Sequence, residues 1–511
     1  MPGPSDPLAA FSDPTRTWFG AAFAEPTPAQ AGAWEAIGAG RHALVVAPTG
    51  SGKTLSAFLW SIDRLMTTPP PKDKKQRTRV LYISPLKALG VDVERNLRAP
   101  LTGIRHTADR LGTPVQEVTV GVRSGDTAAG DRRKLASAPP DILITTPESL
   151  FLMLTSQARD TLRGLETVII DEVHAVAGSK RGAHLALSLE RLDALLDKPV
   201  QRVGLSATVR PLEEVARFLG GSAPVDIVAP PAAKSWDLKV VVPVEDMTQP
   251  GGADSVDDDD SDARSNSSIW PHVEESVVDL IEQHTSTIVF ANSRRLAERL
   301  TARLNEIATT RAELALPPEG EQPAEVMAQA GATRGAETVI AKAHHGSVSK
   351  EQRALIEDDL KRGRLPAVVA TSSLELGIDM GSVDLVVQIE SPPSVASALQ
   401  RVGRAGHQVG ETSRGVLYPK HRGDLAQTAV AVRRMRTGGI EALRIPANPL
   451  DVLAQQVVAM TALEAVDVDE LFALVRRRHQ RRLQRCQCCG RRGILRRPHQ
   501  RGCAQIGRAH V

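Results

Sequence analysis

The eight residues 47–54, Ala-Pro-Thr-Gly-Ser-Gly-Lys-Thr, have the types and spacing of a loop that binds phosphate groups. Gly50 and Gly52 allow backbone angles at which several N–H groups meet one phosphate, and a following helix adds free N–H donors. Lys53 would reach the β- and γ-phosphates, and the Thr54 hydroxyl would bind Mg²⁺. Position 47 is Ala where the strict pattern has Gly. The predicted nucleotide-binding residues are Thr49, Gly50, Ser51, Gly52, Lys53 and Thr54.

An Asp-Glu pair, Asp171 and Glu172, follows the apolar run 167–170. Asp171 could hold the Mg²⁺ shell, and Glu172 could orient and deprotonate the water that attacks a phosphate. An isolated Asp-Glu pair is more often a solvated turn. Together with the phosphate loop earlier in the chain, it predicts a site that hydrolyses a nucleoside triphosphate. Gln30 precedes the loop and could read the adenine edge through its amide, which favours ATP.

These residues need a framework that brings them together. Between residue 44 and about residue 230, short apolar runs alternate with helical patterns, and this alternation predicts βαβ units and a parallel sheet covered on both faces. In such sheets, functional residues lie at the carboxyl ends of the strands. The turn that begins at Ser206 follows another run and could relay the state of the nucleotide. The predicted strands are 43–46, 79–84, 141–145, 167–171 and 202–206.

A second α/β domain is predicted after a break in the pattern. Residues 245–268 are too polar to bury and predict a solvated acidic loop, and residues 310–335 predict a flexible insertion. The apolar runs resume between these segments and after them, without a second phosphate loop. The predicted strands of this domain are 287–294, 339–346, 367–371 and 383–387.

The second domain has two polar clusters that could act on the nucleotide site of the first domain. They are residues 371–379 and 400–407. Arg401 and Arg404 are three positions apart, which predicts one shared face if the segment is helical. An exposed basic helix is the simpler interpretation when this segment is taken alone. A domain without a phosphate loop, when it follows a domain with such a loop, can instead supply arginine fingers across the cleft between the two domains.

Length and composition predict two or three domains, each with its own core. The sequence has no run of 18 or more apolar residues and no N-terminal signal pattern, so we expect a soluble cytoplasmic protein without a membrane partner. The net charge of +3 hides an uneven distribution, because residues 476–511 contain twelve Arg and no acidic residue. The preceding chain has 51 basic and 60 acidic side chains. Any nucleic acid must therefore be held by local donors in a groove.

The last segment, residues 476–511, also contains all four cysteines. Their spacing, Cys-x-Cys-Cys with one distant Cys, suggests zinc but fits no usual pair of metal-binding motifs. The segment lacks apolar periodicity, and its composition changes abruptly. We interpret it as an aberrant, non-native tail, as a shifted reading frame or a sequencing adapter would produce.

Taken in order, the motifs resemble those of superfamily 2 helicases, and three further segments are similar to the bacterial Lhr (large helicase-related) family. These three segments are residues 91–97, 121–126 and 448–456. The superfamily motifs are found at 26–30, 47–54, 84–89, 145–148, 171–174, 206–208, 371–379 and 400–407. The resemblance covers about residues 8–475.

This resemblance implies an ATP-dependent 3′-to-5′ motor on single-stranded DNA that unwinds DNA or RNA:DNA duplexes, with ATP and Mg²⁺ as cofactors and a role in DNA repair. It also implies a cytoplasmic, nucleoid-associated protein. Protein partners are not predicted. Two alternatives stay open, an RNA helicase with the same core and an ATP-gated nucleic-acid clamp that does not unwind. The implied domains are 1–230 and 231–437, both RecA-like, then 438–475 as the start of a winged helix.

The resemblance also assigns roles to residues of the second domain. Gly377 and Asp379 would contact ATP, and Gln400 would join Arg401 and Arg404 in the catalytic set. His407 stands where many relatives have a second finger Arg, so we place most weight on Arg404 and then on Arg401. Few aromatic residues are available for base stacking, so backbone contacts would dominate. The candidate strand contacts are Pro85, Lys87, Arg123, Thr146, Asn292, Arg294, His345 and Thr371.

Overall fold

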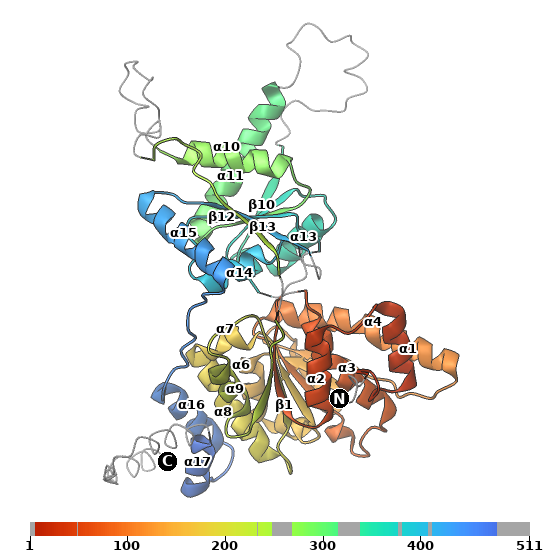
Figure 1. Cartoon of the computed structure of the whole chain (residues 1–511). Helices are drawn as coiled ribbons and strands as arrows, with labels where there is room; N and C mark the ends of the chain where they lie inside the picture. Colours follow the sequence, from red (N-terminus) through yellow and green to blue (C-terminus); the bar gives the residue numbers. More distant parts are fainter. Residues whose placement is uncertain are drawn as a thin grey trace, which may run out of the picture.

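The structure is a computed structural model that describes residues 6–48, 50–231, 234–247, 268–314, 338–376, 381–406 and 411–477. It contains two parallel sheets, stacked one above the other along the molecule (Figure 1). The first sheet has the order β3-β4-β2-β5-β6-β1-β7, and the second has the order β10-β11-β9-β12-β13-β8. The predicted α/β fold class, two tandem RecA-like domains, is confirmed.

The first sheet is built from residues 42–228. Its strands are β1 (His42–Val46), β2 (Val80–Ile83), β3 (Val120–Arg123), β4 (Ile142–Thr145), β5 (Thr167–Ile170), β6 (Gln201–Ser206) and β7 (Val225–Val228). One face is covered by α1 (Asp13–Ala22), α2 (Pro28–Gly38), α3 (Lys53–Thr67) and α4 (Lys87–Leu111). The other face is covered by α6 (Pro147–Leu154), α7 (Val173–Ala177), α8 (Lys180–Leu195) and α9 (Leu212–Gly220). Helix α5 (Ala129–Ser137) follows β3, and the 3₁₀ turns are η1 (Lys74–Gln76) and η2 (Gln157–Leu162).

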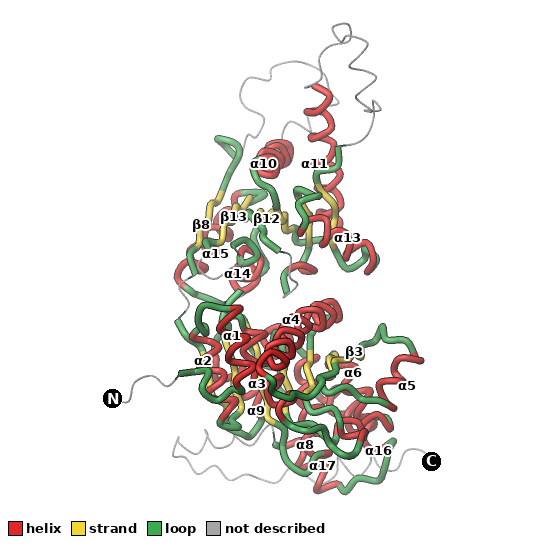
Figure 2. The backbone as a smooth tube through the Cα atoms, turned by 90° about the vertical axis from the view of Figure 1, so that its right-hand side faces the viewer, coloured by secondary structure: helices red, strands yellow, loops and turns green. Residues whose placement is uncertain are grey.

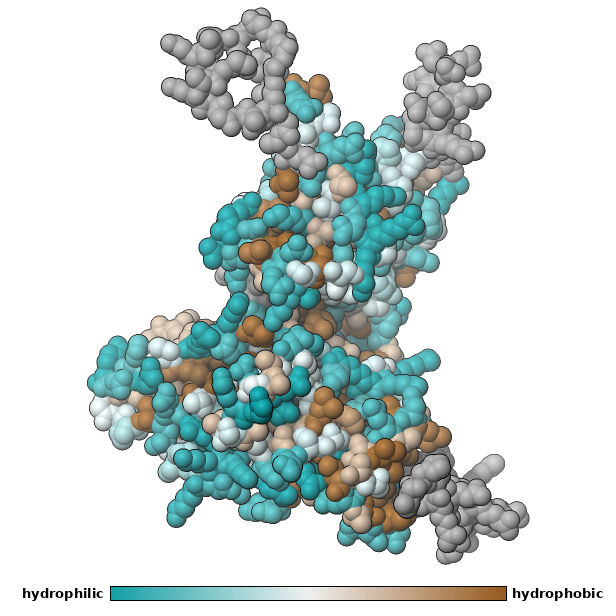
Figure 3. Space-filling model, turned by 180° about the vertical axis from the view of Figure 1, so that it is seen from behind, coloured by the Kyte–Doolittle hydropathy of each residue, from teal (hydrophilic) through white to brown (hydrophobic). Residues whose placement is uncertain are grey.

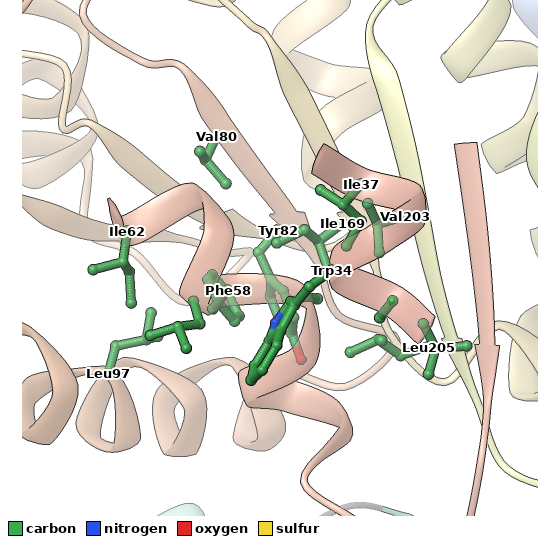
Figure 4. Close-up of a cluster of buried hydrophobic side chains, with 14 of the residues drawn as sticks. Trp34, Ile37, Phe58, Ile62, Val80, Tyr82, Leu97, Ile169, Val203 and Leu205 are labelled. Carbon is green, nitrogen blue, oxygen red and sulfur yellow. The ribbon is translucent and has the colours of Figure 1, made fainter. Parts of the chain in front are cut away.

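The core beneath α2 and α3 fixes the position of the phosphate loop between β1 and α3. Side chains from these helices point toward those of β2, β5 and β6, as Figure 4 shows around Trp34, Phe58 and Tyr82. Phe58 and Tyr82 lie with ring centroids 5.1 Å apart, and both are fully buried. Because the strands are buried on both faces, their apolar runs were readable from the sequence.

The second sheet is built from residues 236–418. Its strands are β8 (Trp236–Val240), β9 (Thr287–Phe290), β10 (Ala341–His344), β11 (Ala367–Ala370), β12 (Leu385–Ile389) and β13 (Ser413–Tyr418). Helices α10 (Trp270–Glu282) and α11 (Arg294–Leu314) cover one face. Helices α13 (Lys350–Lys361), α14 (Val395–Val402) and α15 (Arg422–Thr437) cover the other, and η3 (Ser372–Leu374) follows β11.

Two segments of this domain were predicted to lie outside its packed core, the acidic loop 245–268 and the insertion 310–335. Residues 310–314 continue helix α11, so that part of the predicted insertion is wrong, because Arg311 forms ion pairs with Asp279 and Glu282 of α10. Most of the insertion, and most of the acidic loop 245–268, lies outside the described residues.

The last described helices, α16 (Leu450–Thr461) and α17 (Val468–Arg476), pack on α8 of the first domain (Figures 1 and 2). Gln456 is buried there and accepts a 2.8 Å hydrogen bond from Arg191. Seen from behind, apolar residues gather beside the C-terminal end of the chain (Figure 3), and Leu450, Val468 and Phe472 are more than half exposed. None of the helices within the described ranges has the length and apolar character that a membrane span requires.

Candidate active site

The strand register places the candidate residues of the first domain along one edge. Val46 pairs with Ser206, and Ile83 pairs with both Thr145 and Ile170, so these strands end level with one another. The phosphate loop, the Asp-Glu pair and the Ser206 turn therefore meet at the carboxyl edge of the sheet, as predicted from the alternation of strands and helices.

The phosphate loop has the backbone that its glycines were expected to provide. Gly50 and Gly52 have φ values of 81° and 75°, in the left-handed region, and Gly52 is the N-cap of α3. Lys53 donates a 2.7 Å hydrogen bond from Nζ to the carbonyl of Ala47, and Thr54 follows it in the first turn. The Lys53 ammonium thus lies over the loop, where it could exchange a carbonyl for a phosphate oxygen.

Gln30 lies against the phosphate loop. Its Oε1 accepts from the backbone N–H of Thr27, which completes a capping box at the start of α2, and its Nε2 lies 3.5 Å from the carbonyl of Gly52. A Cβ at position 52 would stand 2.6 Å from Gln30 Nε2, so any other residue there would displace this amide. The amide positions the loop, and its recognition of adenine stays a prediction.

Asp171 and Glu172 are both buried at the end of β5. The Tyr82 hydroxyl donates to Asp171 Oδ2, and the backbone N–H of Glu172 donates to Oδ1 at 2.8 Å. Glu172 has a φ of 45°, which is uncommon for a residue with a side chain and marks a backbone held in place by its surroundings. Tyr82 was not predicted, because its contact with Asp171 joins residues 89 positions apart.

The two carboxyl groups have different proton affinities. Burial, and then the neighbouring charge of Glu172, raise the pKa of Asp171 to about 7. Burial also opposes ionisation of Glu172, but His174, Lys53 and Arg404 hold the pKa of Glu172 below its ordinary value. Glu172 is therefore ionised at neutral pH, as a base must be. A divalent cation beside Asp171 would offset its buried charge, so the residues fit Mg²⁺ held near Asp171 and Thr54.

This pair predicts a stability effect. In the folded protein Asp171 keeps its proton up to about pH 7, whereas an unfolded Asp loses it near the ordinary value, so stability falls as the pH rises between these values. Without Mg²⁺, Asp171→Asn should raise the melting temperature of the first domain at pH 8 by about 2–4 °C, the shift for roughly 1 kcal/mol in a domain of this size. Calorimetry at pH 5 and pH 8 would check this. A larger stabilisation at pH 5 than at pH 8 would contradict it.

The two arginines of the second domain have different surroundings. Arg401 is buried and donates to Glu375 at 3.1 Å, to Asn292 at 3.0 Å and to Gln388 at 2.9 Å, so its guanidinium is held inside its own domain. Arg404 donates to the Glu375 carbonyl at 3.0 Å, and its charge acts on Glu172 of the first domain.

The predicted shared helix face of these arginines is wrong. Helix α14 ends at Val402, Gly403 is its C-cap, and Arg404 lies in the following turn. Because the chain leaves the helix at Gly403, Arg404 can face the other domain while Arg401 stays in the core.

His174 joins the two domains at the site. Its Nδ1 lies 3.4 Å from Glu172 Oε2 and 3.2 Å from Ser206 Oγ, and its Nε2 lies 2.6 Å from the side-chain amide of Gln400. Burial lowers the pKa of His174. A shift of either domain would break the contact with Gln400, so this chain of polar groups can report the state of the cleft to Ser206.

A cleft of about 930 Å³ lies beside this site, between the two domains. Five candidate strand contacts line it: Pro85, Lys87, Thr146, Arg294 and Thr371. Lys87 forms a 2.5 Å ion pair with Asp126, so a strand phosphate would compete with a carboxylate for this lysine. The structure adds Arg181, Lys350 and Arg353, which also line the cleft and were not predicted because no motif marks them.

Three candidate strand contacts are not among the residues that line the cleft. Asn292 accepts from Arg401 and donates to the Ser391 carbonyl, and His345 Nε2 lies 2.5 Å from Glu298 Oε1, so both side chains are engaged within the second domain. Arg123 ends β3 at the sheet edge, where burial lowers the pKa of its guanidinium. Thr49, Gly377, Asp379 and His407 lie outside the described residues.

A phosphate loop and an Asp-Glu pair in one parallel-sheet domain, facing the arginines of a second such domain, define the core of a superfamily 2 helicase. Comparison with family models agrees with this class. The DEAD/DEAH box helicase family matches residues 27–216, and the helicase conserved C-terminal domain matches residues 272–408. The winged helix domain of the large helicase-related protein matches residues 433–484.

Comparison with individual proteins identifies the family of helicases within this class. The chain is 66% identical to an Lhr helicase of Mycolicibacterium smegmatis over 93% of its own length and 31% of the relative, and 55% identical to the Lhr helicase/uracil glycosylase of Escherichia coli over 93% and 32%. It also resembles a solved structure of Mycobacterium smegmatis helicase Lhr bound to ssDNA and AMP-PNP, with a TM-score of 0.80, 64% identity, and coverage of 93% of this chain and 56% of that one.

The chain belongs to the Lhr family of superfamily 2 helicases. It spans about a third of the length of these two bacterial relatives.

Proposed function

We propose that this chain is an ATP-dependent 3′-to-5′ helicase or translocase on single-stranded DNA that unwinds DNA or RNA:DNA duplexes, with a role in DNA repair. The relative solved with ssDNA and AMP-PNP supports two parts of this proposal, the binding of single-stranded DNA and the binding of ATP. The observation that carries the proposal is the 2.6 Å contact of Gln400 in the second domain with His174 in the first, together with the charge of Arg404 that acts on Glu172.

The proposed cycle follows from these contacts. The phosphate loop and Lys53 would hold ATP on the first domain, and Thr54 and Asp171 would hold Mg²⁺, which would neutralise phosphate charge. Closure brings Arg404 to the phosphates, where its guanidinium stabilises the charge that develops during transfer. Glu172 takes the proton of the attacking water. Product release then reopens the cleft, and the strand contacts of one domain shift relative to those of the other.

The remaining site assignments are also proposals. Gly377 and Asp379 would contact ATP, with Thr49, Gly50, Ser51, Gly52 and Gln30. Strand binding would involve the five predicted residues that line the cleft, and we retain Arg123, Asn292 and His345 as weaker candidates. We propose cytoplasmic localisation with nucleoid association, as DNA binding would require.

The domain limits 1–230, 231–437 and 438–475 are proposals as well. The sheets change between Val228 and Trp236, α17 ends at Arg476, and the winged-helix match reaches residue 484. The Arg- and Cys-rich tail lies outside the described residues beyond 477, and its interpretation as non-native sequence stays a prediction.

A second candidate is an ATP-gated nucleic-acid clamp that does not unwind, favoured by the solved relative, which is bound to ssDNA and AMP-PNP. Strand-displacement assays on DNA:DNA, RNA:DNA and RNA:RNA duplexes, each with a 3′ or a 5′ tail, separate the candidates. We expect ATP-dependent displacement of 3′-tailed DNA:DNA and RNA:DNA. Displacement confined to RNA:RNA would indicate an RNA helicase, and ATP-dependent binding without displacement would indicate a clamp.

A further inference from the structure

The segment that connects the two sheets contributes a lysine beside the proposed arginine finger. Lys234 lies between β7, the last strand of the first sheet, and β8, which begins at Trp236 in the second. Its Nζ donates a 3.2 Å hydrogen bond to the carbonyl of Gly403 and lies 5.4 Å from the centre of the Trp236 ring. Gly403 ends helix α14 and immediately precedes Arg404, so the ammonium lies beside the proposed finger.

The charges around Lys234 come from both domains. Burial, and then the positive charges of Arg404 and Lys53, lower the pKa of Lys234 to about 8, while the negative charge of Glu411 acts to raise it. Lys53 belongs to the phosphate loop of the first domain and Arg404 to the second. The Lys234 ammonium, held beside the Gly403–Arg404 turn by its hydrogen bond, therefore also feels the charge of the phosphate loop.

Lys53, Arg404 and Lys234 repel one another, and Glu172, on which Lys53 and Arg404 also act, offsets three positive charges with only one negative charge. The acceptor that Lys234 has in the structure, the Gly403 carbonyl, is neutral, and an ammonium carries three N–H donors. A nucleotide held by the phosphate loop would bring its phosphates to this position and relieve the repulsion. Half-burial would strengthen such a contact relative to one at the surface.

We propose that Lys234 binds the terminal phosphate of the nucleotide, as a third cation beside Lys53 and Arg404. The inference rests on the proposed function, because it requires ATP in this cleft. It extends that function by giving the connecting segment a role. A phosphate that binds Lys234 also fixes the segment through which the second domain is attached, so the terminal phosphate would favour closure directly.

The test compares affinities for AMP-PNP and ADP in the full chain, measured with fluorescent analogues of both nucleotides. Lys234→Met should weaken binding of the triphosphate by about tenfold, as expected when a charge-assisted hydrogen bond is lost, and binding of ADP by less than about twofold. Lys234→Arg should restore most of the affinity, since it keeps the charge. Lys239→Met, an exposed lysine on β8, is the matched control and should bind as the wild type does.

Three results would overturn the inference: no effect of Lys234→Met, an equal loss for both nucleotides, or a loss of turnover with both affinities unchanged. The last result would mean that Lys234 acts only by holding the Gly403 turn. If Lys234→Met does not fold, Lys234→Gln is measured in its place, with the same expected results. If the wild-type chain binds neither nucleotide, the proposed function itself is wrong, and this outcome is distinct from the other three.

Discussion

Glu172→Gln should lower strand-stimulated ATP turnover by roughly 10²- to 10⁴-fold, the usual cost of losing a general base. The amide keeps the shape of the side chain and removes only its ability to accept a proton. Glu172 is suited to this role because it is buried at the strand end, 3.4 Å from His174, and because nearby cations hold its pKa below the ordinary value. Binding of ATP and of single-stranded DNA should persist, since neither depends on the base.

Steady-state phosphate release with saturating strand measures this effect, and titration with labelled strand measures binding. Glu213→Gln is the matched control, because Glu213 is an exposed glutamate in the first turn of α9 in the same domain. Turnover of Glu172→Gln close to that of the control would remove Glu172 from the catalytic role.

Arg404→Lys should lower turnover by roughly 10³-fold with little change in ATP affinity. The first domain holds most of the nucleotide, whereas Arg404 stabilises charge that develops only during transfer. Lysine keeps the charge but loses the planar fork of donors that matches phosphate oxygens. The charge of Arg404 acts on Glu172 of the first domain, as expected of a finger that reaches the site from the second domain.

The comparison variants are Arg401→Lys and His407→Ala, assayed under the same strand-saturated conditions. Arg401 is bonded to Glu375, Asn292 and Gln388, so its replacement should lower the thermal stability of the second domain as well as turnover. His407→Ala should cost least, since a neutral imidazole cannot supply a fixed bidentate charge. If His407→Ala proves the most damaging of the three, the finger lies there and not at Arg404.

Much of the fold was predictable because its central strands are buried on both faces. Runs such as 167–170 are continuously apolar, and β1, β2, β4, β5, β6, β9, β10, β11 and β12 all coincide with predicted runs, within a few residues at their ends. Strands β3, β7 and β8 were not predicted as strands. They lie at sheet edges, where alternating or partial burial leaves no continuous apolar run. Strand β13 was not predicted either, because it begins with polar residues.

The candidate site was predictable where a local motif sets the geometry, as in the phosphate loop and the Asp-Glu pair. The candidate site was not predictable where tertiary contacts between distant residues set the geometry. The family resemblance ranked Arg404 above Arg401, but the end of α14 at Val402, which gives the two arginines different surroundings, was not visible in the sequence. Tyr82 and Lys234 carry no motif, and their contacts with Asp171 and Gly403 span 89 and 169 positions.

The central claim is that the two domains form one site whose ATP hydrolysis depends on a bound strand. The most direct measurement is the rate of phosphate release by the full wild-type chain at saturating ATP and Mg²⁺, with and without single-stranded DNA, with Glu172→Gln setting the background. We predict that the strand raises the rate at least about tenfold and that Glu172→Gln abolishes the increase. A rate above background that is the same with and without the strand would contradict the account.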